Sequence, residues 1–310
     1  MTRSAQCSHP TPELVRAVTA LAARAAEVDG VDPLSEAFRI ALASPDAKAC
    51  HLLAYAACGP DVRAPLAGYA QVAAGSCELV VDPAHRRTGI GAGLLQHALD
   101  IGATAFWAHG LLPAAQATAA GAGLELTRTL HLMGRPLTPA DLADPGLPEW
   151  VRAIRYAERP EAEELLALNA AAFADHPEQG QLTLTALRRL MTQPWFNPQG
   201  LFLLFDRTQP ASAPPIAFHW TKIEPDQEES GGHGEVYVVG VHPAYQGRGL
   251  AGPLTRLGLA QLARKGLSEV RLYVDGDNTA ARRTYARLGF TDLMTDGQYT
   301  LPPTDVRMTP

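Results

Sequence analysis

An internal repeat constrains the fold of this chain more than any other feature of the sequence. Residues 78–95 and 238–255 both read as a strand, a short loop, a glycine-rich turn and the start of a helix. Pro83 aligns with Pro243, an offset of 160 residues (243 − 83) in a chain of 310, and Gly89 aligns with Gly249 at the same offset. Solenoid repeats have periods of about 20–50 residues. A repeat at roughly half the chain length therefore predicts a duplicated domain.

Length and composition agree with two folded domains. The chain of 310 residues is long enough for two cores of about 150 residues each. Hydrophobic residues make up 46% and charged residues 19%, which excludes a disordered or fibrous protein. The net charge of −6 argues against a general nucleic-acid binder.

The sequence indicates a cytoplasmic protein. No apolar run approaches the roughly 18 residues that span a bilayer, and no apolar segment follows Arg3 as in a secretory signal. The cysteines lack the C-x-x-C spacing of zinc sites and argue against a disulfide framework; they are Cys7, Cys50, Cys58 and Cys77. We therefore expect no metal, no nucleic acid or membrane partner, and a monomer in a reducing compartment.

Proline-rich sequence between the copies predicts the domain boundary. Residues 135–149 contain four prolines and a glycine, a composition typical of linkers. We expect an N-terminal domain over 1–140, a linker over 141–150 and a C-terminal domain over 151–310. Alternating strands and helices predict an α/β (α+β) fold with mixed sheets. The expected helices are 12–28, 33–43, 160–174, 250–264 and 278–287; the expected strands are 151–157, 201–206, 215–223, 235–241, 269–274 and one near 298, with a hairpin-type loop over 224–234.

The glycine turn is suited to binding phosphate. Gln246–Gly252 follows a strand and opens a helix. Glycines allow a tight turn that exposes successive N–H groups, and the helix N-terminus adds positive potential. A single turn of this kind could be purely structural, but two copies in matching contexts favour a cradle for a phosphate or pyrophosphate.

A dinucleotide-binding Rossmann site is an alternative interpretation of this turn. Gly247, Gly249 and Gly252 satisfy the G-x-G-x-x-G pattern, and Asp275 closes a strand about 20 residues on. However, residues 242–246 separate the strand from the glycines, and the first copy breaks the triplet spacing. Both copies instead share Gln/Arg-x-x-Gly-x-Gly/Ala.

That shared element resembles the acetyl-CoA pyrophosphate loop of the GNAT superfamily of N-acyltransferases. A second segment, residues 277–290, resembles the N-x-x-A-x-x-x-Y-x-x-x-G-F stretch that closes over coenzyme A in that superfamily. Asn278 is also a plausible N-cap for the helix that follows. The resemblance implies two tandem GNAT domains, each a mixed, mostly antiparallel sheet flanked by helices.

The resemblance also implies which residues bind acetyl-CoA. The strand before the loop carries a bulge in the superfamily, and its backbone meets the pantetheine arm and polarises the thioester. The implied cofactor-binding residues are Leu79, Val80, Val81, Arg87, Thr88, Gly89, Ile90, Gly91 and Ala92 in the first copy, and Val239, Gly240, Val241, Gln246, Gly247, Arg248, Gly249, Leu250, Ala251, Gly252, Asn278, Thr279, Ala280, Ala281, Arg282 and Arg283 in the second.

The two halves differ at a position that matters for chemistry. Aligning residues 123–124 with 289–290 places Ala119 opposite Tyr285, the tyrosine that the superfamily sets beside the departing sulfur. Alanine cannot protonate a thiolate. We therefore expect catalysis in the C-terminal half and a non-catalytic N-terminal half, which either binds a second coenzyme or serves as a structural wall.

Further segments resemble the mycothiol synthase family along essentially the whole chain. They are residues 172–180, residues 33–37 and the stretch from Gly234 to Pro243. The resemblance implies transfer of an acetyl group from acetyl-CoA to the cysteinyl amine of a cysteine–glucosamine–inositol conjugate. This would produce mycothiol and free coenzyme A.

The resemblance assigns roles to individual side chains. Glu235 would act as general base, although it could be an ordinary strand-end carboxylate. Tyr285 would protonate the thiolate, although it could be a core aromatic residue, and backbone N–H groups near Val241 would stabilise the oxyanion. The implied substrate-binding residues are Glu36, Glu178, Lys222, Glu235 and Tyr273.

Periodicity and residue type qualify some of these roles. Tyr273 should point away from the face that Leu272 and Val274 bury. Lys222 could instead lie on a solvated rim. His176 could be a base, but a lone histidine is more often structural.

Two other functions remain open on the sequence alone. The acceptor could be a different small-molecule amine, or a protein N-terminus or lysine, since the acidic residues do not exclude a peptide groove. Alternatively, the chain could be a non-enzymatic sensor that binds acetyl-CoA.

Overall fold

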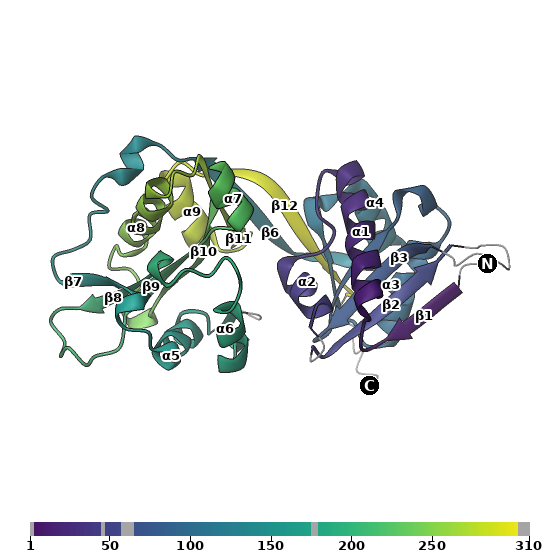
Figure 1. The fold of residues 1–310 in the computed structure, drawn as a ribbon, viewed down its shortest axis with the longest axis horizontal. Coiled ribbons are helices and arrows are strands. Elements are labelled where there is room, and N and C mark those ends of the chain that lie inside the picture. Colours follow the sequence, from purple (N-terminus) through teal and green to yellow (C-terminus); the bar gives the residue numbers. More distant parts are fainter. Residues whose placement is uncertain (1–2, 45–46, 57–64, 175–178, 303–310) are drawn as a thin grey trace, which may run out of the picture. The chain divides into compact units, whose positions relative to one another are not determined.

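The computed structural model divides the chain into two compact units (Figure 1). It describes residues 3–44, 47–56, 65–174 and 179–302. Unit 1 comprises the chain up to Leu130 together with the residues from Met294 onward, and unit 2 comprises His131–Leu293. Within the described residues, no helix is both long and apolar enough to cross a membrane.

Unit 1 is built on a mixed sheet with strand order β1-β2-β3-β4-β5. Its strands pair antiparallel except for β4 and β5, which are parallel. The end of β12 adds to β5 as an antiparallel neighbour, from Gly297↔Ala108 to Thr300↔Ala105. The helices are α1 (Pro12–Asp29), α2 (Glu36–Leu42), α3 (Ile90–Asp100) and α4 (Pro113–Gly121); the strands are β1 (Arg3–Cys7), β2 (Ala49–Tyr55), β3 (Leu66–Ala73), β4 (Ser76–Val81), β5 (Ala105–Ala108) and parts of β6 (Glu125–Pro136) and β12 (Thr291–Thr300).

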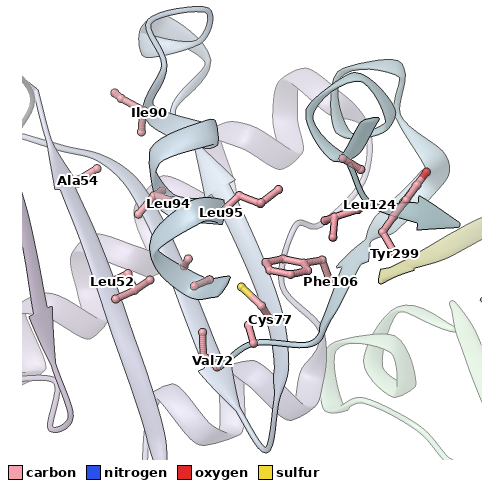
Figure 2. Close-up of a cluster of buried hydrophobic side chains, with 14 of the residues drawn as sticks. Leu52, Ala54, Val72, Cys77, Ile90, Leu94, Leu95, Phe106, Leu124 and Tyr299 are labelled. Carbon is pink, nitrogen blue, oxygen red and sulfur yellow. The ribbon is translucent and has the colours of Figure 1, made fainter. Parts of the chain in front are cut away.

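Hydrophobic clusters cover both faces of the unit 1 sheet. Residues of α1, such as Leu21, pack against Tyr69 and Val80 on one face. Residues of α3 pack with Cys77 and Phe106 in the second cluster. Figure 2 shows this second cluster, in which Tyr299 of β12 lies near Leu124 and Phe106.

Unit 2 repeats the same plan. Its strand order is β7-β8-β9-β10-β11, with antiparallel pairs except for the parallel pair β10–β11. The end of β6 lies beside β11. The helices are α5 (Ala162–Ala172), α6 (Leu184–Leu190), α7 (Pro225–Ser230), α8 (Ala251–Arg264) and α9 (Thr279–Arg287); the strands are β7 (Val151–Arg155), β8 (Leu201–Asp206), β9 (Ala217–Lys222), β10 (His233–Val241) and β11 (Glu269–Asp275).

Different helices pack on the two faces of the unit 2 sheet. Phe218 and Trp220 of β9 pack with α5 and α6 residues such as Leu165 and Leu187. On the other face, α8 packs against β9 and β10. The predicted helices and strands of this half therefore exist and form two cores around one sheet.

The boundaries of the compact units differ from the expected division at 141–150. They fall at 130/131 and 293/294, inside strands β6 and β12, so the expected linker lies within unit 2. Residues 294–300 belong to unit 1, where Tyr299 is buried. The physical reason is that backbone N–H and C=O groups of a strand need hydrogen-bonding partners, and the end of β12 finds them on β5.

The expected hairpin-type loop over 224–234 joins the antiparallel neighbours β9 and β10, as predicted, but it contains a short helix, α7, that the sequence did not indicate. Pro225 occupies the first turn, where its missing N–H costs nothing, together with Asp226 and Glu228. Gly231 ends the helix with a left-handed backbone conformation, φ 65°.

A histidine is enclosed between β9 and α8 of unit 2. His219 is fully buried, and its Nδ1 lies 2.9 Å from the carbonyl oxygen of Leu254. A Cβ added at Gly258 would lie 2.0 Å from the His219 ring, so α8 needs glycine there. Burial lowers the pKa of His219 to about 4. The imidazole is therefore neutral in the folded protein at neutral pH.

This burial predicts a loss of stability in mild acid. Because the folded pKa of about 4 lies below the unfolded value of about 6.5, the unfolded chain binds more protons as the pH falls through that window. From about pH 7.5 to about pH 5.5, the free energy of unfolding should fall by about 1–1.5 kcal/mol more in the wild type than in His219→Leu. Urea unfolding followed by tryptophan fluorescence measures this difference. An equal fall in both proteins would contradict it.

Candidate active site

A bulge in β10 marks the centre of unit 2. Val236 lies opposite Thr221 of β9, but Val238 lies opposite Trp220, so Tyr237 is an extra residue in the ladder. The parallel pairing of β10 with β11 runs from His233↔Glu269 to Val236↔Leu272, whereas β10 continues to Val241. Beyond the bulge, β10 therefore has no ladder partner in β11. Bulges of this kind re-aim side chains and backbone groups beside active sites.

Unit 1 lacks this bulge. The ladder between β3 and β4 runs without interruption from Gly68↔Val81 to Ala73↔Ser76. We expected Leu79, Val80 and Val81 to form a bulged strand like that of the second copy. The strand is present, but the expected bulge is absent from its ladder with β3. The two halves share a topology but not this local geometry.

The second glycine loop has open space above it. Gly247 and Gly249 have φ of 74° and 77°, values that an L side chain adopts only with strain. A Cβ added at either position would have no neighbour within 4 Å. The loop is tied to its strand because Gln246 Nε2 donates to the carbonyl oxygen of Val241 at 3.1 Å.

The helix behind this loop begins without a side-chain cap. At α8 no side chain accepts a hydrogen bond from the first amides. Among the described α-helices, α3, α4, α5 and α7 also lack such a cap, whereas α1, α2, α6 and α9 have one, from Thr11, Ser35, Thr183 and Asn278. The first N–H groups of α8 are thus left for another acceptor, and a pyrophosphate at Gln246–Gly252 would supply one.

The first loop has a similar shape with a different residue. Arg87 takes the place of Gly247 and has φ 63°, and Gly89 has φ 86°. Arg86 Nε donates to the carbonyl oxygen of Val81 at 3.2 Å, as Gln246 does to Val241. Helix α3 also lacks a side-chain cap. The geometry of the first loop is therefore compatible with a second phosphate-binding cradle.

Tyr285 lies on α9, on the α8 side of the unit 2 sheet. Asn278 caps this helix, as predicted, by accepting a hydrogen bond from the N–H of Ala281 at 3.1 Å. Tyr285 packs against Phe290, with ring centroids 5.7 Å apart, and joins the cluster of α8 residues. Burial raises the pKa of its phenol to about 12. The hydroxyl group therefore keeps its proton across the neutral range.

Backbone hydrogen bonds support the alignment of Ala119 with Tyr285. The N–H of Phe290 donates to the carbonyl of Tyr285 at 3.1 Å, and the N–H of Leu124 donates to the carbonyl of Ala119 at 3.0 Å. Ala119 is 5% exposed in the unit 1 core. Both halves therefore have the same backbone turn at the end of this helix, but only unit 2 carries a tyrosine at the aligned position.

Glu235 lies on the other face of the same sheet. Lys222 of β9 and Arg271 of β11 stand directly opposite it. Directly opposed residues share a face, so a carboxylate stands between two cations. Lys222 is 7% exposed, which rules out the solvated rim considered from the sequence. Its Nζ lies 2.9 Å from Glu224 Oε1.

The other predicted substrate residues have different outcomes. Tyr273 is 47% exposed while Leu272 and Val274 are buried, which confirms its predicted direction. Glu36 lies in the first turn of α2 in unit 1, and its role toward the C-terminal site stays a prediction. Glu178 and His176 lie outside the described residues.

An aromatic cluster beside the bulge was not predicted from the sequence. The rings of Trp195 and Tyr237 lie 4.9 Å apart, and Trp220 lies 5.5 Å from Tyr237. Lys222 Nζ lies 5.1 Å from the Trp195 ring centroid and 5.6 Å from that of Tyr237. No motif indicated this cluster, although the alternation of Phe218, Trp220 and Lys222 along β9 was a usable signal.

Comparison with known proteins identifies the family. Residues 162–290 match the acetyltransferase (GNAT) family. Mycothiol acetyltransferase of Thermobispora bispora is 46% identical over 93% of this chain and 96% of its own length. The protein of the same name from Mycobacteroides abscessus is 44% identical over 90% and 93%. The chain belongs to the mycothiol acetyltransferase family.

Solved structures agree with the fold of this family. A tandem GNAT protein from the clavulanic acid biosynthesis pathway covers 98% of this chain and all (100%) of its own, with a TM-score of 0.70 at 16% identity. A GNAT-family acetyltransferase from Colwellia psychrerythraea covers 97% and 100% with a TM-score of 0.61 at 14% identity. The predicted tandem GNAT fold is confirmed. The relatives of 44–46% identity and the matched family make the chain an acetyltransferase.

Family membership decides between the interpretations of the glycine turn. The strand and loop of the second copy lie inside the matched GNAT region, so the Rossmann alternative is wrong. Among the described residues, no group of three or more histidine, cysteine, aspartate or glutamate side chains could hold a metal ion.

Proposed function

We propose that this chain transfers the acetyl group of acetyl-CoA to the cysteinyl amine of 1D-myo-inositol 2-(L-cysteinylamino)-2-deoxy-α-D-glucopyranoside, giving mycothiol and coenzyme A. The observation that carries the proposal is the bulge at Tyr237, where β10 parts from β11, with Glu235 on one face and Tyr285 on the other. The names of the relatives support the acceptor.

Acetyl-CoA would be held by the second glycine loop and the start of α9. The uncapped amides of α8 and the open positions at Gly247 and Gly249 fit a pyrophosphate. Arg282 and Arg283 add positive charge in the first turns of α9, a helix that contacts α8. The bound thioester supplies the electrophilic carbonyl carbon. The freed N–H groups of β10 near Val241 would stabilise its developing oxyanion.

Glu235 would remove a proton from the substrate amine. An ammonium group cannot attack a thioester until it loses a proton, so an ionised carboxylate must be within reach directly or through water. Lys222 and Arg271 stand opposite Glu235 on the two neighbouring strands. Lys222 and Tyr273, on the same face, would contact the polyhydroxylated substrate.

Tyr285 would complete the transfer by protonating the leaving thiolate. The nitrogen–carbon bond forms, the carbon–sulfur bond breaks, and the electron pair stays on sulfur. A phenol with a pKa of about 12 remains protonated until that thiolate appears. Glu235 would thus accept a proton on one face of the sheet, and Tyr285 would donate one on the other face.

Replacing Tyr285 by phenylalanine tests this role. We expect kcat to fall about 10- to 100-fold with little change in the KM for acetyl-CoA, because general acid catalysis is lost while the packing remains. We also expect no basic limb from this phenol in the wild-type kcat profile below about pH 10. Tyr156→Phe removes a buried hydroxyl outside the site and is the matched control. Equal kcat values for both variants would argue against the acid role.

Unit 1 would carry no acetyl transfer of its own. Its β4 lacks the bulge, and Ala119 replaces the tyrosine. The loop at Arg87–Ala92 is still compatible with a bound coenzyme. Glu36 of this unit and Glu178 would contact the substrate.

Thiol release from acetyl-CoA tests the proposed function. Release that depends on the cysteine–glucosamine–inositol conjugate, and not on a peptide amine, is the expected result. Release with the peptide alone would keep acetyl transfer but overturn the acceptor. Tight acetyl-CoA binding without release in either case would favour a sensor.

A further inference from the structure

A small cavity lies in unit 2 beside the bulge of β10. Its volume is about 20 Å³, enough for one small group. The residues that line it come from α5, α6, β9, β10 and the segment before α6, and include Leu165, Asn169, Gln179, Leu190, Phe218 and Trp220. The walls are therefore mostly aliphatic and aromatic.

The amide side chains at this cavity are hydrogen-bonded to one another. Asn169 Nδ2 donates to the carbonyl oxygen of Gln179, and Gln179 Nε2 donates to Asn169 Oδ1, each at 2.8 Å. Trp220 differs from them. Its indole Nε1–H is buried and, among the described residues, meets no hydrogen-bond acceptor. A buried donor without a partner is uncommon in native proteins and calls for an explanation.

The Trp220 ring is held in place by its neighbours. It is 2% exposed and makes edge-on contacts with Phe196, at 5.6 Å, and with Tyr237, at 5.5 Å. Aromatic rings offer an N–H only weak interactions. The indole therefore cannot turn easily toward another acceptor, and a ligand in the cavity could supply one.

The position of the cavity relates it to the reaction. Trp220 lies opposite Val238, the residue after the bulge, and two residues from Lys222, which faces Glu235. Cavity and proposed base thus share one face of the sheet. An amine that attacks a thioester at the bulge carries its own side chain on the adjacent carbon. In a cysteinyl group that side chain is CH2–SH, short enough to stay beside the bulge.

We propose that this cavity is the subsite for the CH2–SH group of the cysteinyl acceptor, with Trp220 Nε1–H directed toward the sulfur. This inference rests on the proposed function. Sulfur is polarisable, makes favourable contacts with aromatic rings and accepts hydrogen bonds weakly, which suits apolar walls with a single donor. A hydroxyl group would lose more hydration on entering the same walls. The cavity would therefore select cysteinyl over alanyl and seryl conjugates.

The test compares acceptors that differ only in this side chain. Conjugates bearing cysteinyl, alanyl or seryl groups are assayed by coenzyme A release with the wild type, Trp220→Phe and Leu190→Phe. We expect the wild-type kcat/KM for the cysteinyl conjugate to exceed that for the alanyl conjugate by at least about tenfold, as for a buried group of this size. Leu190→Phe, which fills the cavity, should bring the ratio close to one. Trp220→Phe should lower it about threefold or more, because the weak hydrogen bond and part of the ring contact with the sulfur are lost.

A control separates this effect from the loss of any tryptophan. Trp150→Phe removes an indole that stacks on Tyr245 outside the cavity, and it should leave the ratio unchanged. Equal wild-type kcat/KM values for cysteinyl and alanyl conjugates would overturn the subsite, as would an unchanged ratio in both cavity variants. Absence of release with every conjugate would instead count against the proposed function, so the two failures are distinguishable.

Discussion

Replacing Glu235 by glutamine is expected to lower kcat by about 100- to 10,000-fold while the KM for acetyl-CoA stays nearly unchanged. Glutamine keeps the shape of the side chain but cannot take a proton from the substrate amine. The expected loss is large because Glu235 is the only carboxylate on β10. Steady-state kinetics with the conjugate measure both constants.

Glu228→Gln is the matched control for this variant. Glu228 lies on α7, partly exposed, with its Oε1 2.8 Å from Lys265 Nζ. The same chemical change there should leave kcat within about twofold, since surface pairs contribute little. If Glu235→Gln kept a wild-type rate, Glu235 would not be the base, and a side chain elsewhere or water would have to take the proton.

Replacing Gly249 by aspartate should raise the KM for acetyl-CoA about 100-fold with a smaller effect on kcat. Aspartate tolerates the left-handed backbone at φ 77° better than most residues, and its Cβ would meet no atom within 4 Å. The protein should therefore stay folded. The new carboxylate would stand beside the uncapped amides of α8, where the pyrophosphate is proposed to bind. A repulsion of about 3 kcal/mol between the carboxylate and the pyrophosphate corresponds to about 100-fold in affinity.

The duplication provides the control for this experiment. Gly89→Asp makes the same change in unit 1, at φ 86° and again in open space. If unit 1 carries no chemistry, the KM and kcat of turnover should stay close to the wild type. A large loss of turnover in Gly89→Asp would show instead that the first loop contributes to the reaction.

Local signals in the sequence predicted the elements that carry the motifs. The helix expected at 250–264 is α8, Ala251–Arg264, and the helix expected at 278–287 is α9, Thr279–Arg287. Asn278 caps α9 as its residue type indicated. Such features depend on side-chain type and spacing within a few residues, so they can be recognised without knowing the fold.

The details of pairing could not be recognised in this way. The bulge at Tyr237 is a register shift against β9, and no residue of β10 alone distinguishes it from the uninterrupted ladder of β4. Helix α7 was missed because its six residues are too short to show helical periodicity. The Trp220 cavity needs side chains from four elements and the segment before α6 to come together.

The sequence by itself determined the duplication, the glycine loops, the tyrosine of the second half and, through the resemblance they carry, the acetyltransferase family. Only the tertiary structure decided that β12 ends in the sheet of unit 1, that Lys222 is buried opposite Glu235, and that the bulge belongs to unit 2 alone. The physical reason is the range of the interactions. Turns, caps and helix faces depend on neighbours along the chain, whereas strand register and burial depend on partners far away in sequence.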